Sequence, residues 1–402
     1  MIRAALIGAT GYGKYYLSQL IRLQEEGKVQ LLGVVVREPE KAAGQITQIN
    51  AIGARVFPCV SDMYKILKGQ IDLCCIPTGI ASHAPLTIEA LNEGCNVLVE
   101  KPAAATIQDI TQMKAAEKAS GKRVMVGFQN IYGNDVQKIK RKILDGAVGV
   151  LQSIKLKGLW VRHKDYFFRN SWAGKLKVNG QWILDSPANN AFAHFINIMC
   201  FLAGDRLETS AKIKNIQAEL YRALPIESCD TACARMMTAQ HVLLQFYVTH
   251  ACGQNIHPEI EIKGSKGTVN WTLNRYAINQ KEQVTASDES TGMDNVRMAM
   301  FDHVIAKLNG QDVPVCDLDI AAAHTFCINA MHRASAIQNI PKEHCDVSQT
   351  PRGEQVQIKD IESIFQKAFK EEKLLSELGV SWANAAEVFD CTGMNVFKGP
   401  KE

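Results

Sequence analysis

A glycine-rich turn near the amino terminus constrains the fold of this chain more than any other feature. Residues 2–7 form a short apolar run, and Gly8-Ala9-Thr10-Gly11-Tyr12-Gly13 follows it directly, before apolar residues at helical spacing. In a strand, turn and helix of this kind, glycines let the backbone approach a pyrophosphate, and the helix N-terminus favours the anion. The spacing is G-x-x-G-x-G, not G-x-G-x-x-G, and such turns also serve as plain connections. The turn predicts an α/β fold, with dinucleotide binding as one interpretation.

The end of the second predicted strand, residues 29–36, is the place where a dinucleotide fold contacts the adenosine ribose. Arg37 occupies this place, and Glu38 follows it. An arginine can pair with a 2′-phosphate, whereas an acidic residue accepts hydrogen bonds from a 2′-hydroxyl. Arg37 therefore favours NADP slightly over NAD. The alternative is that Arg37 is a solvated loop cation and that Glu38 contacts the ribose.

Two later strand ends add residues to the predicted nucleotide site. Residues 71–76 form an apolar run before the loop 77–83, and residues 96–100 form another that ends at Glu100-Lys101-Pro102. Ligands of open α/β sheets gather at the carboxyl ends of the strands, so we expect Lys101 in the crevice beside the nicotinamide. Pro102 restricts Lys101 to extended geometry, and the structural alternative is a charged strand end capped by a proline.

The length and composition of the chain limit its class. A chain of 402 residues exceeds a single core and should form two domains, and 47% hydrophobic with 21% charged residues is ordinary for a globular protein. No apolar run is long enough to span a bilayer, and the N-terminal apolar stretch is already used as a strand. A net charge of +4 is too small to indicate nucleic-acid binding.

The twelve cysteines lie mainly inside strand or helix patterns, which predicts reduced thiols and a cytoplasmic protein. Cys229 and Cys233 lie near His241, but no second ligand pair completes a metal pattern, so we predict no metal. His250 and His257 are interpreted as structural. Residues 356–378 are predicted to form a charged amphipathic helix that packs on the body of the protein or on a partner.

A stretch of aromatic and cationic residues follows the nucleotide-binding part. It includes Trp160, Arg162, Tyr166, Arg169 and Trp172. Aromatic faces stack on sugar rings, and arginines can hold hydroxyls or a carboxylate. The alternative is that the tryptophans pack at the sheet edge while the cations are solvated.

These motifs together resemble the glucose-fructose oxidoreductase and inositol dehydrogenase (Gfo/Idh/MocA) family. The shared marks are the glycine loop, Pro77 and His83, the Glu100-Lys101-Pro102 triplet, residues 126–129 and the segment 180–204 with His194. The resemblance covers most of residues 1–335. It implies an α/β protein with an N-terminal Rossmann domain, a doubly wound parallel sheet, over 1–127. A C-terminal α/β domain over 128–402 would carry a large open, mostly antiparallel sheet that often forms the oligomer interface.

The same resemblance implies hydride transfer between a nicotinamide cofactor and a secondary alcohol or ketone of a sugar, cyclitol or derivative. Family members typically carry an Asp four residues before this histidine and often another three after it, but this chain has Asn190 and Asn197. Asparagine takes up no proton at neutral pH, although it can orient a neighbour by hydrogen bonds. We expect His194 as base, Lys101 as the group that polarises the substrate oxygen and relays the proton, and Asn190 as a positioning residue.

The predicted cofactor-binding residues are Gly8, Thr10, Gly11, Tyr12, Gly13, Arg37, Pro77, Thr78, His83, Glu100 and Lys101. The predicted substrate-binding residues are Lys101, Arg162, Tyr166, Arg169, Trp172, Asn190 and His194. The expected partner is a small carbohydrate-like molecule, and the expected assembly is a homodimer or homotetramer. Two other functions stay open: a glycosidase that retains NAD and oxidises the sugar transiently, and a nucleotide-binding relative that has lost catalysis.

Overall fold

The computed structural model describes residues 1–281 and 283–401 of the chain, which divides into two compact units. Unit 1 contains Met1–Ala104, Gln108–Tyr132 and Val296–Leu318, and unit 2 contains Ala105–Ile107, Gly133–Asn295 and Asp319–Glu402. The units are built from alternating pieces of chain. The predicted domains 1–127 and 128–402, which are continuous, stay a prediction.

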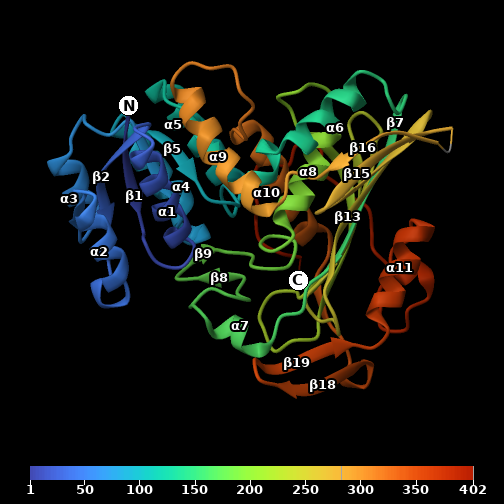
Figure 1. The fold of residues 1–402 in the computed structure, drawn as a ribbon. Coiled ribbons are helices and arrows are strands. Elements are labelled where there is room, and N and C mark those ends of the chain that lie inside the picture. The colour runs from blue at the N-terminus through green and yellow to red at the C-terminus, as the bar shows by residue number, and fades with distance from the viewer. Residues whose placement is uncertain (282, 402) are drawn as a thin grey trace. The chain divides into compact units, whose positions relative to one another are not determined.

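Unit 1 contains a six-stranded parallel sheet in the order β3-β2-β1-β4-β5-β6. Its strands are β1 (Ile2–Ile7), β2 (Val29–Val35), β3 (Arg55–Phe57), β4 (Leu73–Ile76), β5 (Asn96–Val99) and β6 (Val124–Val126). The helices beside it are α1 (Gly13–Glu25), α2 (Ala43–Ala51), α3 (Val60–Ile66), α4 (Ile80–Asn92), α5 (Ile107–Ser120) and α9 (Met293–Leu308) (Figure 1). The strand order reverses between β1 and β4, where ligands of such sheets bind. This topology confirms the predicted doubly wound sheet.

Unit 2 contains a ten-stranded sheet in the order β16-β15-β14-β13-β7-β12-β11-β10-β17, with β20 also paired to β10. Its strands are β7 (Leu151–Leu159), β10 (Ile213–Arg222), β11 (Thr231–Thr238), β12 (Leu243–Thr249), β13 (Ile256–Gly264), β14 (Gly267–Thr272), β15 (Arg275–Gln280), β16 (Gln283–Glu289), β17 (Ile337–Asn339) and β20 (Phe389–Asp390). Among the described strands of this sheet, only the β7–β12 and β10–β17 pairs are parallel. The predicted mostly antiparallel sheet is confirmed.

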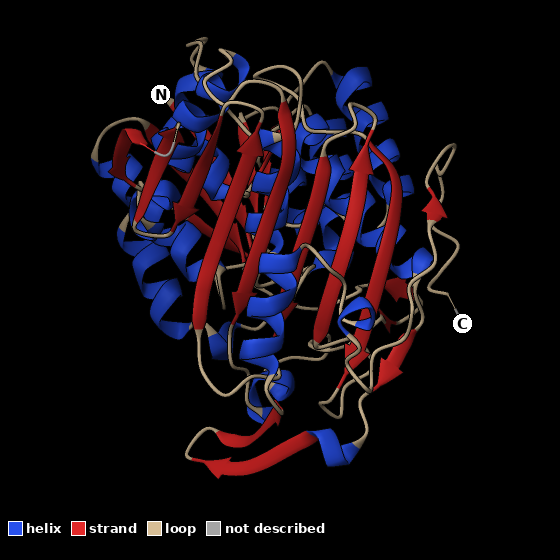
Figure 2. Cartoon of the chain, turned by 90° about the vertical axis from the view of Figure 1, so that its right-hand side faces the viewer, coloured by secondary structure: helices blue, strands red, loops and turns tan. Residues whose placement is uncertain are grey.

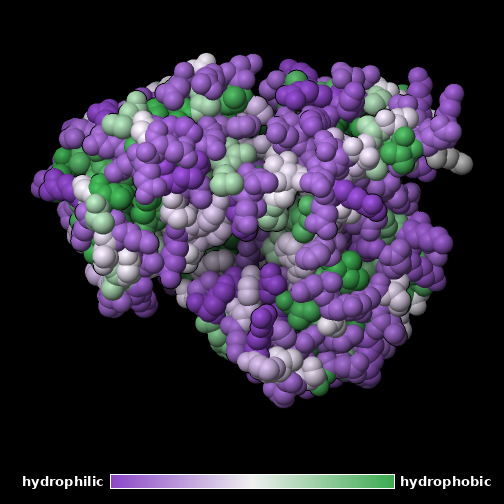
Figure 3. Space-filling view, viewed as in Figure 1, coloured by the Kyte–Doolittle hydropathy of each residue, from purple (hydrophilic) through white to green (hydrophobic). Residues whose placement is uncertain are grey.

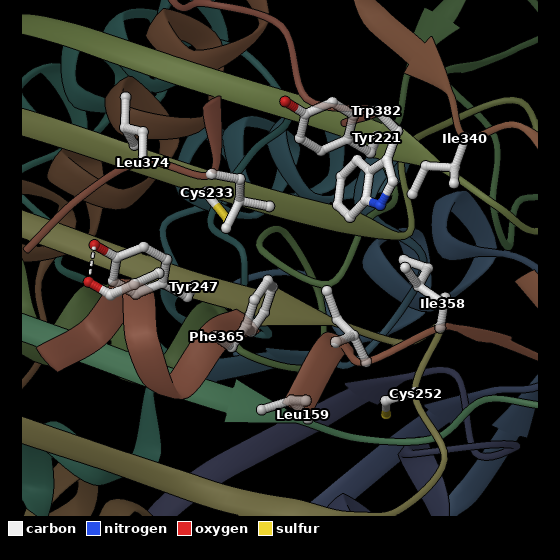
Figure 4. Packing of buried hydrophobic residues seen from close by; sticks show 14 of the residues in the cluster. Leu159, Tyr221, Cys233, Tyr247, Cys252, Ile340, Ile358, Phe365, Leu374 and Trp382 are labelled. Atoms are coloured by element: carbon white, nitrogen blue, oxygen red, sulfur yellow. Dashed lines mark hydrogen bonds between the residues drawn. The ribbon is translucent and has the colours of Figure 1, made fainter. Parts of the chain in front are cut away.

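One face of this sheet is partly covered by the chain's own C-terminal segment. Helix α11 (Ile361–Glu371) lies across the strands (Figure 2), and its Phe365 packs in a buried cluster with Tyr247 and Leu159 of the sheet (Figure 4). Tyr247 Oη donates to Ala368 O at 3.2 Å, which ties the helix to β12. The predicted amphipathic helix is therefore present and packs on the body. It is shorter than 356–378, because residues up to Ile358 belong to strand β19 (Gly353–Ile358).

The other face of the sheet carries α8 (Ala193–Leu202), a buried helix that contacts β7, β12 and β13. Unit 2 also contains α6 (Asn134–Leu144), α7 (Lys164–Phe168), α10 (Leu318–Ala334), the hairpin of β18 (Cys345–Thr350) with β19, and the short strands β8 (Lys177–Val178) and β9 (Gln181–Trp182). In the described part of the chain, no helix is long and apolar enough to cross a membrane. Hydrophilic residues cover most of the surface seen in Figure 3.

Candidate functional site

The glycine loop of unit 1 connects β1 to α1 at the switch point of the sheet. Gly8 and Gly11 have φ of 99° and 55°, which side-chain-bearing residues rarely adopt. A Cβ on Gly13 would lie 2.3 Å from Gly8 O, so only glycine fits there. Within the described chain, the amides of Thr10, Gly11 and Tyr12 donate to no backbone carbonyl. Unused amides before a helix N-terminus fit the pyrophosphate of a dinucleotide.

The loop after β4 lies against this glycine loop. A Cβ built on Gly8 would lie 3.5 Å from Thr78 Cγ2, and one built on Gly13 would lie 3.6 Å from Pro77 Cγ. The structure therefore brings together two loops that the sequence places about seventy residues apart.

Arg37 and Glu38 follow β2 and are both exposed. Glu38 forms an ion pair with Lys41 at 2.8 Å, and the hydrogen bond that it accepts from Lys41 lowers the pKa of Glu38. Arg37 forms no ion pair with any described residue. The acidic residue is thus already engaged, whereas the guanidinium group of Arg37 is available.

His83 lies inside unit 1 and braces the lysine-bearing turn. Its Nδ1 lies 2.7 Å from Pro102 O and its Nε2 lies 3.0 Å from Thr78 O. Burial lowers the pKa of His83, and a neutral ring has one N–H, so it donates to only one of these carbonyls at a time. His83 thus connects the loop after β4 with the turn that carries Lys101. This contact is with protein, and the predicted contact with the cofactor stays a prediction.

Glu100, directly after β5, is a buried carboxylate with two protein donors. It accepts hydrogen bonds from Tyr16 Oη and from the Lys101 backbone N–H, both at 3.0 Å. Burial raises the pKa of Glu100 to about 7, although Lys101 and Arg297 oppose the shift. A Cβ on Gly127 would lie 2.6 Å from Glu100 Oε1, so the carboxylate also fills the space beside that glycine.

Helix α9 adds a residue to unit 1 that the sequence did not indicate. Arg297 lies 5.6 Å from the ring of Tyr15, and its charge lowers the pKa of both Glu100 and Tyr12. No local motif marks Arg297, because it lies far along the chain from the glycine loop. Only the return of residues 296–318 to unit 1 places it there.

In unit 2, the predicted catalytic histidine lies in the first turn of α8. His194 is 9% exposed, and Asn197 is fully buried one turn later. Asn190 donates through Nδ2 to Asp185 Oδ1 at 2.9 Å, while Asp185 Oδ2 accepts the Gly174 N–H at 2.7 Å. Asp185 is therefore a partner of Asn190 that the sequence interpretation did not assign. The positioning role of Asn190 toward His194 stays a prediction.

The predicted aromatic and cationic residues do come together. The guanidinium carbon of Arg169 lies 3.4 Å from the ring centroid of Tyr166 and 5.3 Å from that of Trp172. The guanidinium carbon of Arg162 lies 4.7 Å from the same Tyr166 ring. Trp160 instead stacks on a buried phenylalanine at 4.7 Å, which favours the packing interpretation for that tryptophan.

A narrow recess in unit 2 is lined by residues of the aromatic stretch and of the segment before α8. Its lining consists of Tyr166, Phe167, Asp185, Ser186, Pro187, Asn190, Cys229 and His250. His250, which the sequence gave no reason to treat as more than structural, is 3% exposed and forms part of this wall. Among the described residues, no group of three or more His, Cys, Asp and Glu is arranged to hold a metal ion.

The fold and the two sets of residues define a class of protein: a dinucleotide-binding Rossmann unit combined with a unit built on an open sheet. Residues 2–128 match the family described as oxidoreductase family, NAD-binding Rossmann fold. Residues 136–270 match the GFO/IDH/MocA C-terminal domain. The chain belongs to the Gfo/Idh/MocA family of oxidoreductases.

Two curated proteins and one solved structure are similar to this chain. The 1-carboxy-3-chloro-3,4-dihydroxycyclohexa-1,5-diene dehydrogenase of Comamonas testosteroni is 26% identical over 205 residues, which cover 50% of this chain and 48% of that protein. The inositol 2-dehydrogenase/D-chiro-inositol 3-dehydrogenase of Halalkalibacterium halodurans is 25% identical over 209 residues, covering 52% and 54%. The chain thus spans about half the length of these curated relatives.

The third is a solved structure. The WlbA dehydrogenase from Bordetella pertussis, crystallised with NADH and UDP-GlcNAcA, has a TM-score of 0.65 and 23% identity. The likeness covers 82% of this chain and 95% of that one, and it shows that the two share a fold.

Proposed function

We propose that this protein is an NAD(P)-dependent oxidoreductase that transfers hydride between a nicotinamide cofactor and a secondary alcohol or ketone of a sugar, cyclitol or derivative. The observation that carries the proposal is Lys101, a half-buried lysine two residues after the end of β5 in a family-matched NAD-binding unit. The relatives support the substrate class, since the names of both curated proteins describe hydroxylated six-membered rings.

The residues of this chain have separable tasks in such a reaction. The nicotinamide ring, when bound, supplies a hydride acceptor for the carbon that carries the hydroxyl. The Lys101 ammonium group donates a hydrogen bond to the substrate oxygen and stabilises the charge that develops on it. His194 accepts the hydroxyl proton, so the alcohol loses one hydride and one proton and becomes a ketone. The amides of the glycine loop hold the pyrophosphate.

The test is to replace each proposed group and to separate turnover from nucleotide binding. We expect Lys101→Met and His194→Ala each to lower kcat by about 10²–10⁴-fold while NADH still binds. The exposed Lys68→Met serves as a matched control in the same unit and should keep wild-type turnover. Turnover near the wild-type level in Lys101→Met would contradict the assignment.

We further propose that NADP is preferred over NAD, because Glu38 is paired with Lys41 whereas Arg37 is unpaired among the described residues. Arg37→Ala should weaken NADPH binding by about 10-fold, with little effect on NADH, since a charged pair with the 2′-phosphate is lost. Glu38→Ala is the control, and it should leave NADPH affinity unchanged. Equal NADPH affinity in wild type and Arg37→Ala would remove the preference. A loss of NADH affinity in Glu38→Ala would instead assign the ribose to Glu38.

The nucleotide that the purified protein carries tests the two remaining functions. Asn190 and Asn197 take up no proton at neutral pH, so neither can act as a catalytic base. This is why a glycosidase with retained NAD and a relative without catalysis both stay open. A stoichiometric, retained NAD released on denaturation would favour the glycosidase or an oxidoreductase that does not release its cofactor, and it would overturn the NADP preference. Firm NADP binding without turnover of any sugar or cyclitol would favour lost catalysis.

A reduced cytoplasmic location and a homodimer or homotetramer complete the proposal. All twelve cysteines are free, which supports a reducing compartment. Because α11 covers part of one sheet face, an assembly through that face would have to use the strands that α11 leaves uncovered. Light scattering coupled to size-exclusion chromatography measures the assembly directly.

A further inference from the structure

We propose that the C-terminal segment of the chain, residues 341–401, positions the predicted substrate-binding residues of unit 2. It contacts the stretch 160–190, which carries most of those residues, at two separate places. Phe397 makes one contact, with Trp182, and the hairpin of β18 and β19 makes the other, with α7. This inference rests on the proposed function and adds positioning residues to it. Both family models end before residue 271, so neither describes this segment.

The first contact joins the C-terminal segment to β9. Phe397 is 2% exposed, and its ring lies edge-on to that of the half-buried Trp182, with 5.3 Å between the ring centroids and 71° between the planes. A Cβ built on Gly399 would lie 3.4 Å from Trp182 Cζ2, so the backbone of the segment packs on the same indole. Aromatic pairs of this geometry contribute more than the area that they bury. Trp182 is therefore held from outside its own hairpin.

The part of the segment that carries Phe397 is itself fixed to the body of unit 2. Before it, strand β20 pairs with β10. After it, Arg333 Nη1 donates to Gly399 O at 3.2 Å, and the Lys401 N–H donates to a backbone carbonyl of α10 at 2.7 Å. Hydrogen bonds on both sides of Phe397 restrict its movement, so its ring can fix the position of Trp182.

Trp182 is connected to the predicted site by the residues that follow it. Asp185 lies three residues further on, and its backbone N–H donates to Lys175 O at 3.0 Å. Its carboxylate accepts from the Gly174 N–H at 2.7 Å and from Asn190 Nδ2 at 2.9 Å. Asp185 thus ties together the two ends of the loop 174–190. Displacing Trp182 displaces this carboxylate, and with it the predicted residue Asn190.

The second contact joins the hairpin of β18 and β19 to α7, which lies beside it (Figure 1). His163 Nδ1, just before α7, lies 3.3 Å from Thr350 Oγ1 of the hairpin. A Cβ built on Gly353 would lie 2.6 Å from Asp165 Oδ1, so the hairpin turn and α7 approach closely. Tyr166, the ring on which both predicted arginines lie, is the next residue of this helix. The hairpin therefore supports the aromatic end of the stretch, and Phe397 supports its other end.

The two contacts can be weakened while the rest of the segment stays docked. Helix α11 is held to the sheet by its own buried cluster, which includes Phe365, Tyr247 and Leu159. A variant at Phe397 removes none of these three side chains. Its effect on substrate binding can therefore be separated from a loss of the whole C-terminal segment.

The first test measures amide hydrogen exchange and needs no ligand. Phe397→Ala should raise exchange over 174–190 by about 10-fold, the change expected when an aromatic pair is lost. Val396→Ala is the control, because that neighbouring side chain is 47% exposed, and it should leave exchange at the wild-type level. Unchanged exchange over 174–190 in Phe397→Ala would overturn the inference.

The hairpin contact is tested by a matched pair of glycine variants. Gly353→Val places a branched side chain against Asp165 and should raise exchange over 160–172. Gly379→Val introduces a similar backbone strain, since the two glycines have φ of 91° and 72°, but no other atom lies within 4 Å of its Cβ. It should leave exchange over 160–172 unchanged. Equal exchange in the two variants would remove the hairpin from the inference.

The second test measures KM and kcat with myo-inositol and D-glucose as probes, together with NADH affinity. Phe397→Ala should raise KM by about 10-fold, lower kcat by less than this factor, and leave NADH affinity unchanged. A general loss of folded protein would instead lower kcat and leave KM as it is. Trp182→Ala/Phe397→Ala should be no worse than either single variant, because both remove one shared contact. Phe397→Leu, which keeps an apolar side chain, should retain more of the affinity.

The outcomes separate this inference from the proposed function. Raised exchange in Phe397→Ala, in a protein that turns over neither probe nor any other sugar or cyclitol, would contradict the proposed function alone. Turnover with a wild-type KM in Phe397→Ala would contradict this inference alone. Additive effects of Trp182→Ala and Phe397→Ala on KM would also overturn it, since the two side chains would then act independently.

Discussion

Replacing Glu100 with glutamine should change how the stability of the protein depends on pH. The wild-type carboxylate is 6% exposed and accepts hydrogen bonds from Tyr16 and from the Lys101 backbone. Burial raises its pKa from 4.5 to about 7 despite those donors. Glutamine has a similar shape but does not titrate, so Glu100→Gln removes this proton-binding site while filling the same space.

The sign and the size follow from linkage. Between pH 4.5 and about 7 the folded protein binds a proton at Glu100 that the unfolded chain has lost, so stability falls as the pH rises through this range. At about 1.4 kcal/mol per pH unit, the loss attributable to Glu100 is on the order of 3 kcal/mol. Below pH 4.5 Glu100 is protonated in both the folded and the unfolded state, and above pH 8 it is ionised in both. Outside this range, Glu100 therefore adds no pH dependence to the free energy of unfolding. Asp230 is a second buried carboxylate whose pKa burial raises, to about 6, and its contribution has the same sign.

Urea unfolding of the nucleotide-free protein at pH 4.5, 6 and 8 tests this reasoning. Because Asp230 is present in both proteins, subtracting the variant curve from the wild-type curve isolates Glu100. The wild-type stability minus that of Glu100→Gln should fall by about 3 kcal/mol between pH 4.5 and 8. A difference that stays constant over this range would refute the raised pKa. A difference that increases with pH would show that the hydrogen bonds outweigh the burial.

Three other predictions follow from packing and positioning. Phe365→Ala should lower the free energy of unfolding by about 3–5 kcal/mol in urea titrations, because its buried ring joins α11 to the sheet, and a loss below 1 kcal/mol would show that α11 is loosely attached. His83→Ala should lower kcat by about 10²-fold, since it releases the turn that carries Lys101; an unchanged kcat in steady-state assays would exclude that positioning role. Gly158→Ala should destabilise by about 1–3 kcal/mol in thermal unfolding, because its Cβ would lie 2.5 Å from a buried ring, whereas Gly44→Ala, with open space in α2, should stabilise slightly.

The parts of the fold that follow from local sequence were predictable, and the parts that depend on distant pairing were not. The alternation of buried runs and helices before residue 127 gives the parallel sheet, and the glycine loop places its switch point. The return of residues 296–318 to unit 1 leaves no local signal, because an amphipathic helix shows that it packs but not on which sheet. The same limit applies to α11, for which the sequence left the body of the protein and a partner as alternatives.

In the candidate site, too, some features follow from local sequence and others depend on contacts between distant segments. The proximity of Gly8 and Gly13 to the loop that begins at Pro77 follows from the strand ends on which these residues lie, whereas their contact with a cofactor stays a prediction. The role of His250 could not be assigned, since a histidine near the end of a buried strand has the same pattern whether its ring nitrogens are used by the protein or left for a ligand. Only the contact of Nδ1 with Trp160 O shows that the protein uses one of them.

Cations elsewhere in unit 2 show what a structural charge looks like in this protein. Lys155 and Lys157 on β7 are also held against an aromatic ring, that of Phe369, but each has a carboxylate partner, Glu261 at 2.8 Å and Glu259 at 3.5 Å. Burying a charge costs free energy unless it is paired, so these lysines stabilise the fold only together with their partners. Arg162 and Arg169, which follow β7 in the same chain segment, keep contact with solvent and lack carboxylate partners among the described residues. Arg169 is exposed and stays unpaired at little cost, whereas Arg162 is half-buried and its Nε is buried without a hydrogen-bond partner among the described residues. Both guanidinium groups are ordered on the ring of Tyr166. That combination stabilises nothing by charge pairing in the free protein, which is why we keep the two arginines as predicted substrate-binding residues and do not assign them to the fold.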